Sequence, residues 1–397
     1  MPLALVRSAT MLPYLLLIPC VVWLVSAFMA VRTIRGIPQL VQVQSPEPAR
    51  WPKVSVIVPA CNEAGTLPGA AEKLLALEYP ALELVFINDR STDGTGAVVD
   101  QLATQDERIR AVHVAELPEG WLGKPHAMER GCEVASGDWL LFTDADVHFA
   151  PQTLARAIAW CEAGQVDHLA VIPDVEARGF ALQAALASFG RYFTLGRRLW
   201  AVNDDNSSTF IGIGAFNLVR RSALERTEGL SWLAGDTVDD LALGMLMRQS
   251  GARCRVLWGR DALSVHWYET LGTMIVGLEK NTYPMAGCSL WRIGLASATV
   301  LVLDWTPLAL VFWPGVPGWL ATTALLTLVL CLPLGAAIAR WARRPLLPAL
   351  VVPFGSALMA YIMLRAGIVG TLRGGIRWRG TFYSRDMLRR GARVKML

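Results

Sequence analysis

The sequence predicts an α/β domain with a mostly parallel sheet, flanked by transmembrane helices at both ends. Apolar segments of strand length alternate with helical segments between residues 51 and 268, which is typical of parallel sheets. Residues 11–31 carry no charge and are long enough to cross a bilayer core, and a second apolar block covers residues 294–371. With 53% hydrophobic residues, the chain is too apolar to be one soluble globule.

The first strands and helices are predicted from apolar runs and the turn residues that bound them. VSVIVPA at 54–60 is a continuous apolar run of strand length, and residues 64–77 follow with helical character. ELVFIND at 83–89 is the second buried strand. The next helix begins around Asp93, which serves as its N-cap. IRAVHVA at 109–115 has the composition of a third strand.

The middle of the domain continues the alternation and then becomes less regular. A helix is expected at 124–135, and the apolar run DWLLFT at 138–143 predicts a buried fourth strand. Beyond Asp146 the pattern is weaker. The remaining elements are, in order, helix 152–162, strand 168–173, helix 181–200, strand 211–219, helix 238–250 and strand 254–258.

Six regions follow from this pattern. They are an N-terminal transmembrane anchor (1–35), a linker (36–50), the α/β domain (51–268), an interfacial amphipathic helix (269–293), membrane helices (294–371) and a basic C-terminal tail (372–397). A cleaved signal peptide is the alternative for the first region, but its apolar run is too long and lacks a clear cleavage site.

The cysteine and charge patterns limit the compartment and the partners. Seven scattered cysteines without a CxxC pair provide neither a disulfide framework nor a zinc site, which fits a reducing compartment. The net charge of +4 is modest, and its basic part is concentrated from residue 365 onward. Because no aromatic stacking platform or nucleic-acid motif accompanies these residues, we expect the tail to contact anionic lipid or phosphate rather than nucleic acid.

Polar side chains follow the predicted strands at four places. These are residues 59–63, residues 88–95, Asp144 with Asp146, and residues 238–241. Carboxylates at the carboxyl ends of parallel strands face a ligand crevice. Strand alternation points Asp144 and Asp146 the same way, which suits a hard divalent cation shared with a phosphorylated ligand. Alternatively, Asp144 and Asp146 simply mark the end of a strand. The carboxylates in 238–241 would then interact favourably with the dipole at the start of a helix.

Five segments together resemble the signature of the inverting family-2 glycosyltransferases with a GT-A fold. In order, they are PACNEA, FINDRSTDGT, GWLGKPHAM, TDAD and VDDLALG. Within that family the chain is most similar to ceramide glucosyltransferases and to hopene- and carotenoid-associated bacterial glycosyltransferases. The segments GIGAFNLVRRSALE and GLEKN and the WRGTFY tail carry that closer similarity. The resemblance implies a Rossmann-like, mostly parallel mixed sheet.

The resemblance also implies which residues bind a nucleotide-sugar donor. Four residues would frame its uracil and ribose, namely Pro59, Asn62, Glu63 and Asp89. Lys124, just before a helix, would lie near the donor, and the alternative is an ordinary helix-start cation.

Four carboxylates are implied to carry the chemistry. Asp144 would contact the donor and, with Asp146, hold the Mg²⁺ or Mn²⁺ that bridges the diphosphate, because the departing oxygens need charge neutralisation. Asp240 would be the general base for the acceptor hydroxyl, and Asp239 stands where the family usually has Glu. A single base on the face opposite the leaving group gives displacement with inversion.

One departure from the family concerns processivity. Processive polysaccharide synthases carry a QxxRW motif, whereas this chain has GLEKN at the comparable place, and its Arg377–Trp378 pair follows the membrane segments. We therefore expect transfer of one sugar rather than polymerisation. Lys280 and Arg377 are candidate partners of the diphosphate, or interfacial cations that anchor to lipid headgroups. His266 and Trp267 could approach the metal or the acceptor, or form a packed aromatic pair.

The expected function is transfer of one sugar from a nucleotide-sugar, with a UDP-sugar as the expected donor, to a hydroxyl of a membrane lipid. A polyprenyl-phosphate acceptor is one alternative, and a catalytically degenerate membrane scaffold or export component is another. Because nucleotide-sugars are cytosolic, we expect a multi-pass protein of the inner (cell) membrane whose catalytic domain faces the cytosol.

The C-terminal membrane segments raise a question of topology. Spans at 295–315, 317–339 and 346–370 would leave the basic tail outside, against the positive-inside tendency. That conflict disappears if the proline-containing last segment is a re-entrant hairpin, which is tolerated only when it is buried in protein. Asp304 lies within the apolar block, where it would face an acceptor hydroxyl, pair with a tail arginine or lie near an interface.

Overall fold

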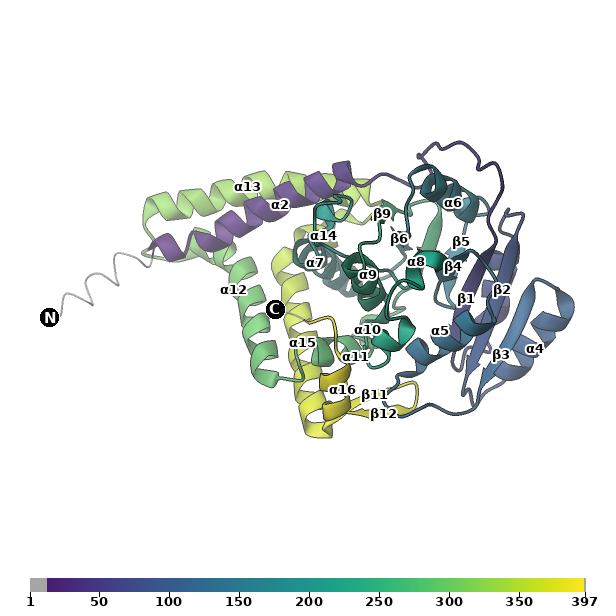
Figure 1. Cartoon of the computed structure of the whole chain (residues 1–397). Coiled ribbons are helices and arrows are strands. Elements are labelled where there is room, and N and C mark those ends of the chain that lie inside the picture. The colour runs from purple at the N-terminus through teal and green to yellow at the C-terminus, as the bar shows by residue number, and fades with distance from the viewer. Residues whose placement is uncertain (1–12, 396–397) are drawn as a thin grey trace. The chain divides into compact units, whose positions relative to one another are not determined.

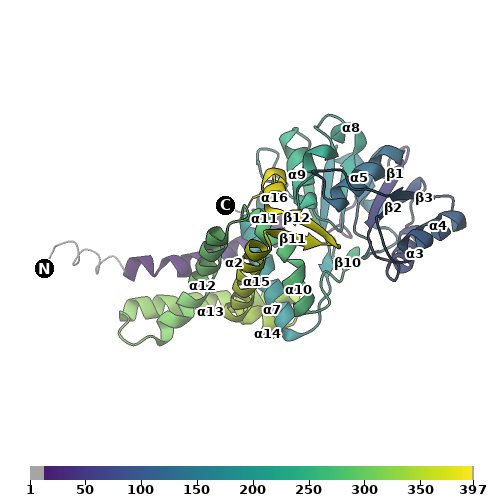
Figure 2. The same cartoon turned by 90° about the horizontal axis from the view of Figure 1, so that it is seen from below.

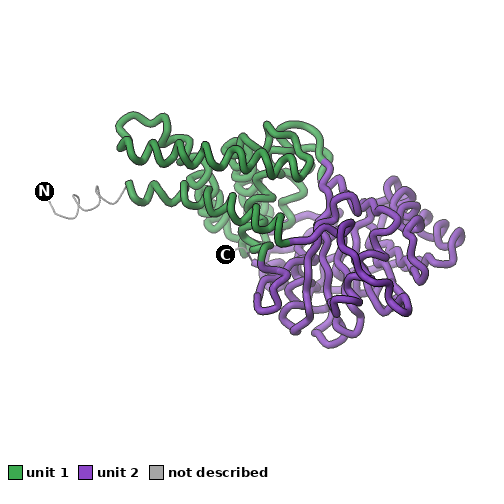
Figure 3. Tube along the Cα trace, turned by 90° about the horizontal axis from the view of Figure 1, so that it is seen from above, with its two compact units in different colours: residues 1–36, 177–200, 268–373 green, residues 37–176, 201–267, 374–397 purple. Residues whose placement is uncertain are grey.

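The computed structural model describes residues 13–395, and the chain forms two compact units (Figure 3). The helical unit contains residues 1–36, 177–200 and 268–373, and the α/β unit contains residues 37–176, 201–267 and 374–397. The first twelve residues of the predicted anchor lie outside the described residues. The chain thus leaves the α/β unit twice and returns to it each time.

A seven-stranded sheet forms the core of the α/β unit (Figure 1) and confirms the predicted α/β class. Its strand order is β3-β2-β1-β4-β8-β6-β9. Neighbouring strands are parallel, except that β8 pairs antiparallel with β4 and β6. The strands are β1 (Val54–Ala60), β2 (Leu82–Asp89), β3 (Ile109–Val114), β4 (Trp139–Phe142), β6 (His168–Ile172), β8 (Asn217–Arg220) and β9 (Cys254–Trp258).

Apolar burial explains why these segments become central strands. Val54 and Ile57 of β1 and Trp139 of β4 are all 0% exposed. The Trp139 indole donates a hydrogen bond to Glu162 at 2.8 Å, so this large side chain is buried with its N–H satisfied. Continuous apolar runs of this kind are typical of strands that are covered on both faces.

The strand order changes direction at β1, and this positions the functional site. Strands β1, β2 and β3 follow one another outward on one side, whereas β4 pairs with the other side of β1. In open α/β sheets, ligands bind at such a switch point, at the carboxyl ends of the strands. Pro59, near the end of β1, and Asp144, just after β4, therefore flank the expected crevice.

Short helices connect the strands of the α/β unit, and two of them start later than predicted. The helix expected from residue 64 begins at Leu67, and the helix expected near Asp93 begins at Thr95, because hydrogen-bonded loops occupy the residues between. The helices of this unit are α3 (Leu67–Leu75), α4 (Thr95–Gln105), α5 (Gly123–Val134), α6 (Thr153–Ala163), α8 (Arg221–Leu224) and α9 (Asp239–Gln249), with short turns η1 (Leu199–Ala201) and η2 (Leu230–Leu233).

The strand predicted at 211–219 is wrong in its first half, because only β8 from Asn217 onward pairs in the sheet. The preceding residues pack their main chain directly against the first turns of α9. A methyl group on Gly212 would overlap the carbonyl oxygen of Asp240, and one on Gly244 would overlap that of Ile211. This approach requires glycine on both sides and is a tertiary contact, which an apolar run does not reveal.

A smaller sheet carries the residues that follow the acidic pair. It consists of β5 (Val147–Phe149), β10 (Leu263–Val265) and β7 (Asp174–Val175), in that order. Val265 lies opposite Val147 in the antiparallel register, and His266 and Asp146 are the residues that directly adjoin this pair. The His266 ring also lies 3.3 Å from the carboxylate of Glu176.

Four helices of the helical unit have the length and hydropathy to cross a membrane, counted over the described residues. They are Pro13–Gly36, which contains α2 (Ile18–Gly36), α12 (Leu290–Phe312), α13 (Gly318–Trp341) and α15 (Val352–Arg373). The segment expected as one interfacial helix forms two short helices that meet at Leu278 (Figure 2). The shorter helices of the unit are α7 (Phe180–Gly196), α10 (Leu271–Gly277), α11 (Glu279–Met285) and α14 (Leu346–Leu350).

Asp304 of α12 is fully buried and forms an ion pair with Arg191 of α7. Its predicted pairing with a tail arginine is therefore wrong. The guanidinium group of Arg191 also lies 5.2 Å from the ring centroid of Trp23 on α2. The pair joins three helices within the unit and offsets the charge of a carboxylate in apolar surroundings.

The C-terminal tail is a folded part of the α/β unit. Its anchor is Asp236, a residue that is 1% exposed and whose carboxylate accepts hydrogen bonds from the backbone amides of Arg393 at 2.7 Å and Val394 at 3.0 Å. The side chains of Leu388 and Val394 are buried. The elements of the tail are the hairpin strands β11 (Gly375–Trp378) and β12 (Thr381–Ser384) and the helix α16 (Arg385–Gly391).

The folded tail constrains how the chain crosses a membrane. Residues on either side of the 268–373 segment belong to one compact unit. If this segment is inserted in a membrane, these residues must lie on the same side, and the segment must cross an even number of times. Because it contains three candidate spans, we expect that one of them does not cross fully. Helix α15 is the most enclosed, with 39% of its apolar window buried in protein, compared with 22% for α12 and 17% for α13.

We expect a reporter fused after Leu397 and a reporter inserted at the exposed residues 204–206 to lie on the same side of the membrane. A reporter inserted at the exposed turn 313–315, between α12 and α13, should lie on the opposite side and serves as the control. Protease accessibility in sealed vesicles of known orientation measures all three. Opposite sides for the first two reporters would contradict the even number of crossings.

Candidate active site

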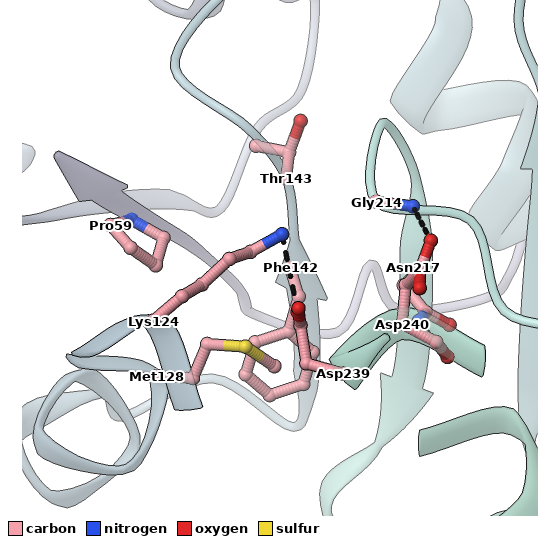
Figure 4. Close-up of a pocket in the computed structure, with 9 residues that line it drawn as sticks. All are labelled: Pro59, Lys124, Met128, Phe142, Thr143, Gly214, Asn217, Asp239 and Asp240. Carbon is pink, nitrogen blue, oxygen red and sulfur yellow. Dashed lines mark hydrogen bonds and ion pairs between the residues drawn. The ribbon is translucent and has the colours of Figure 1, made fainter. Parts of the chain in front are cut away.

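A pocket lies at the switch point between β1 and β4 (Figure 4). Its walls come from the end of β1, the first turns of α5, the end of β4, the 212–217 segment and the start of α9. The residues that line it are Pro59, Lys124, Met128, Phe142, Thr143, Gly214, Asn217, Asp239 and Asp240. The fold therefore brings together predicted site residues that are separated by up to 181 positions in the sequence.

Lys124 bridges two of the predicted carboxylates. Its ammonium nitrogen lies 2.7 Å from Oδ1 of Asp144 and 3.1 Å from Oδ2 of Asp239, and Figure 4 shows the side chain reaching from α5 toward Asp239. Burial alone would lower the pKa of Lys124, but the charges of Asp144, Asp239 and Asp240 raise it well above its usual value. Lys124 is therefore a permanent cation in the pocket.

Asp240 is held in a fixed orientation by backbone amides. Its Oδ2 accepts a hydrogen bond from the Gly214 amide at 3.0 Å, and its Oδ1 accepts one from Leu241 at 2.8 Å. Removal from water raises the pKa of Asp240 to about 6, and the charge of Asp239 adds to this, whereas Lys124 opposes it. A half-buried carboxyl group with such a pKa can exchange a proton near neutral pH.

Asp146 lies at the rim of the pocket, where its side chain is exposed at the surface. The surrounding protein nevertheless keeps much of the bulk water away from the carboxyl group. This desolvation, together with the charge of Asp144, raises the pKa of Asp146 to about 6, and Glu63 contributes in the same direction.

A metal at this rim would depend on oxygen atoms from a ligand. Within residues 13–395, no three His, Cys, Asp or Glu side chains converge closely enough to hold a metal ion by themselves. Mg²⁺ characteristically uses one or two carboxylates and completes its shell with water and substrate phosphate oxygens. Asp146 and Asp144 could provide that kind of partial oxygen set. The His266 ring is directed to the Glu176 carboxylate, 3.3 Å away.

Asp89 is engaged by a neighbour that the sequence reasoning missed. The Asp89 carboxylate is 4% exposed and accepts two hydrogen bonds from the Arg90 guanidinium, at 2.7 and 3.0 Å. Gly123 lies so close that a methyl group there would overlap Asp89. The resulting bidentate pair occupies the end of β2, beside the start of α5.

Asn62 and Glu63 connect the loops that follow β1 and β2. Oδ1 of Asn62 accepts a hydrogen bond from the Thr92 amide at 2.8 Å, and the Asn62 amide donates to Oγ of Ser91 at 3.0 Å. Asn62 has a φ of 57°, a left-handed conformation that asparagine tolerates better than most residues. Asp93 accepts a hydrogen bond from the Thr95 amide at 2.9 Å, but the N-cap of α4 is Gly94, so the predicted N-cap is wrong by one residue.

The tail hairpin contacts the same loops. Arg379 forms an ion pair with Glu63 and donates to the carbonyl oxygen of Cys61 at 2.9 Å. The Tyr383 hydroxyl accepts a hydrogen bond from the Gly123 amide at 3.3 Å. Arg379 and Tyr383 belong to the WRGTFY segment, which signalled a tail of this type but gave no indication of where it folds.

The other two predicted donor contacts lie away from the pocket lining. Arg377 is on β11 and its side chain is exposed. Lys280 belongs to α11 of the helical unit. Of the eleven predicted site residues, Pro59, Lys124, Asp239 and Asp240 line the pocket, and Asp144 joins them through Lys124.

Comparison with known proteins identifies relatives of this chain. Residues 55–227 match the family model described as Glycosyl transferase family 2. The chain is 24% identical over 230 residues to the 4,4'-diaponeurosporenoate glycosyltransferase of Staphylococcus haemolyticus, across 57% of this chain and 60% of that protein. It is 29% identical over 169 residues to a PGL/p-HBAD biosynthesis glycosyltransferase of Mycobacterium bovis, across 42% of this chain and 62% of that protein.

A solved structure extends the similarity to most of the fold. A mannosyltransferase from Pyrobaculum calidifontis, in complex with GDP-Man and Mn²⁺, matches 90% of this chain and 99% of its own with a TM-score of 0.53 and 21% identity. At that identity the likeness concerns the fold, and it confirms the predicted GT-A architecture. The matched part of this chain spans less than two thirds of the length of each of the two curated relatives.

We expect Asp236→Ala to release the tail from the α/β unit. The substitution leaves the amides of Val238, Arg393 and Val394 without their acceptor, which should cost on the order of 3 kcal/mol. Limited proteolysis and thermal unfolding of the detergent-solubilised protein measure the effect. Asp386→Ala, at an exposed position of α16, is the matched control. A tail that stays as resistant as the wild type in Asp236→Ala would show that this anchor is dispensable.

Proposed function

Because residues 55–227 form a domain of glycosyl transferase family 2, we propose that this chain transfers one sugar, with inversion, from a nucleotide-sugar to a hydroxyl of a membrane lipid. One observation carries the proposal. The pocket at the switch point contains Asp240, whose pKa burial raises to about 6 and whose carboxylate is oriented by the Gly214 amide at 3.0 Å. A carboxyl group in that setting is suited to general base catalysis.

The donor would bind along the carboxyl ends of β1 and β2. Pro59, Asn62, Glu63 and Asp89 remain the proposed contacts of the nucleoside, and all four lie at or just beyond these strand ends. A ribose hydroxyl would share the Asp89 carboxylate with Arg90. We propose a UDP-sugar as the donor. A GDP-sugar is the appropriate comparison, because the mannosyltransferase of the same fold was solved with GDP-Man.

Asp146 and Asp144 would hold Mg²⁺ or Mn²⁺ at the rim of the pocket. Their carboxylate oxygens are the hard ligands that these cations prefer. When bound, the cation neutralises charge on the departing nucleoside diphosphate. Lys124, the permanent cation between Asp144 and Asp239, would supply positive charge beside the donor from the protein itself.

Asp240 would take the proton from the acceptor hydroxyl as its oxygen attacks the sugar. Asp239, one residue earlier in α9, is held by Lys124 and keeps the pKa of Asp240 high enough for the carboxylate to be an effective base near neutral pH. One such base on the face opposite the leaving group produces a single displacement with inversion.

The helical unit supports a lipid acceptor. It contains four described helices of membrane-spanning length and hydropathy. We propose that the protein is a multi-pass protein of the inner (cell) membrane and that the α/β unit faces the cytosol, where nucleotide-sugars are available. Lys280 and Arg377 remain candidate partners of the diphosphate or of lipid headgroups.

We expect membranes that contain this protein to label a lipid from one of a panel of radiolabelled UDP- and GDP-sugars. Asp240→Asn should reduce this transfer by about 10²–10⁴-fold, because it removes the base. Binding of the donor, measured by calorimetry with Mn²⁺, should persist in that variant. Asp205→Asn, an exposed aspartate paired with Arg255, is the control and should transfer normally. Transfer that survives in Asp240→Asn would indicate a phosphate acceptor, which needs no strong base.

We also expect the turnover rate to fall as the pH drops below about 6, because Asp240 is then protonated and cannot act as the base. The measurement is kcat against pH at saturating donor and Mn²⁺, so that loss of metal binding does not contribute. In Asp239→Asn, the loss of a neighbouring negative charge lowers the pKa of Asp240, and the acid limb should move to lower pH. If the acid limb of the kcat profile does not move in Asp239→Asn, a group other than Asp240 controls the loss of turnover at low pH.

A further inference from the structure

Hydrogen bonds fix the main chain of Asp240 as well as its side chain. The carbonyl oxygen of Asp240 accepts a hydrogen bond from Nδ2 of Asn217 at 3.2 Å. Asn217 is the first residue of β8, is 1% exposed and lines the pocket. The same segment provides the Gly214 amide for the Asp240 carboxylate and the close packing of Gly212. Asn217 therefore sets the position of the turn from which the proposed base projects.

A second buried residue orients Asn217. His168 begins β6, and Ala170 lies opposite Asn217 in the antiparallel register, so strand alternation places His168 and Asn217 on the same face. Nε2 of His168 lies 2.6 Å from Oδ1 of Asn217. His168 is 0% exposed. The contacts thus run from His168 through Asn217 to the backbone of Asp240.

The chemistry of these contacts allows one assignment of hydrogens. Nδ2 of Asn217 donates to the Asp240 carbonyl, so Oδ1 must be the acceptor and Nε2 of His168 must carry the hydrogen. Turning the amide over would place two acceptors, Oδ1 of Asn217 and the Asp240 carbonyl, against each other. Within the described residues, Nδ1 of His168 has no hydrogen-bond partner. The imidazole is therefore neutral with its hydrogen on Nε2.

The neutral state of His168 persists through the working pH range. Burial lowers the pKa of His168 to about 4, since a second ring N–H would have nothing to donate to among residues 13–395. The Nε2–H group of His168, which donates a hydrogen bond to Asn217, therefore keeps its hydrogen near neutral pH. These contacts consequently hold the turn in one geometry while Asp240 itself gains and loses a proton.

We propose that Asn217 and His168 are positioning residues of the transfer reaction, acting through the backbone of Asp240. The inference rests on the proposed function, because it assigns the base role to Asp240. The hydrogen bonds from His168 through Asn217 run to the main chain of Asp240 and not to its carboxylate. Asn217 fixes the turn, and His168 keeps the Asn217 amide in the orientation that donates to the turn.

The test compares Asn217→Leu with Asn203→Leu. Asn203 is the matched control, because its amide also bonds to main chain, at Val256 and away from the pocket lining. We expect Asn217→Leu to lower kcat by about 10²-fold, the loss that a displacement of about 1 Å causes in a catalytic group. Its binding of UDP or GDP with Mn²⁺ should be unchanged. Equal turnover in Asn217→Leu and in the control would overturn the inference.

Substitutions of His168 provide an independent test that does not depend on how well Asn217→Leu folds. His168→Gln keeps an N–H donor at a similar reach and should retain most of the turnover. His168→Leu removes the donor and should lose turnover to the same extent as Asn217→Leu. Equal losses in both His168 variants would overturn the role assigned to the Nε2 hydrogen. A wild-type protein that labels no lipid from any donor would instead overturn the proposed function.

Discussion

The site depends on one arrangement of charge, in which the Lys124 ammonium group lies between Asp144 and Asp239. Three carboxylates, those of Asp144, Asp239 and Asp240, share a small pocket, and like charges at such distances destabilise the ionised forms. Lys124 offsets part of that repulsion. Removal from water, with a smaller contribution from neighbouring carboxylates, raises the pKa values of Asp146 and Asp240 to about 6.

The fold makes this arrangement possible by gathering distant segments at the strand switch point. β1 and β4 provide the two sides, α5 brings Lys124, and α9 brings the acidic pair. The glycine-containing segment before β8 then fixes the start of α9 by main-chain contact. The tail contacts the loops on one side through Arg379 and the loop before α9 on the other side through Asp236. Contacts of the tail therefore support the loops on both sides of the site.

The sequence predicts the parts of the fold and site that depend on local patterns. It does not predict the parts that depend on contacts between distant residues. β1, β2 and β4 are continuous apolar runs, and their burial follows from composition alone. Asp144, Asp146 and Asp240 were identified because polar groups at strand ends and helix starts follow a regular pattern. The 211–216 coil was not foreseen, since its conformation comes from packing against α9. Asp236 and His168 were missed because their partners lie in other elements, and short-range patterns contain no signal for such pairs. Arg90 is adjacent to its partner Asp89, but proximity in sequence does not show that the two side chains pair.

The position of the tail has a consequence for how the protein is made. A ribosome synthesises residues 374–395 after all the helices of the helical unit, yet these residues supply the partners of Asp236 and Glu63. The α/β unit can therefore form these contacts only after the last candidate membrane helix has been synthesised. The order of the polypeptide thus delays completion of the α/β unit until the helical unit has been made.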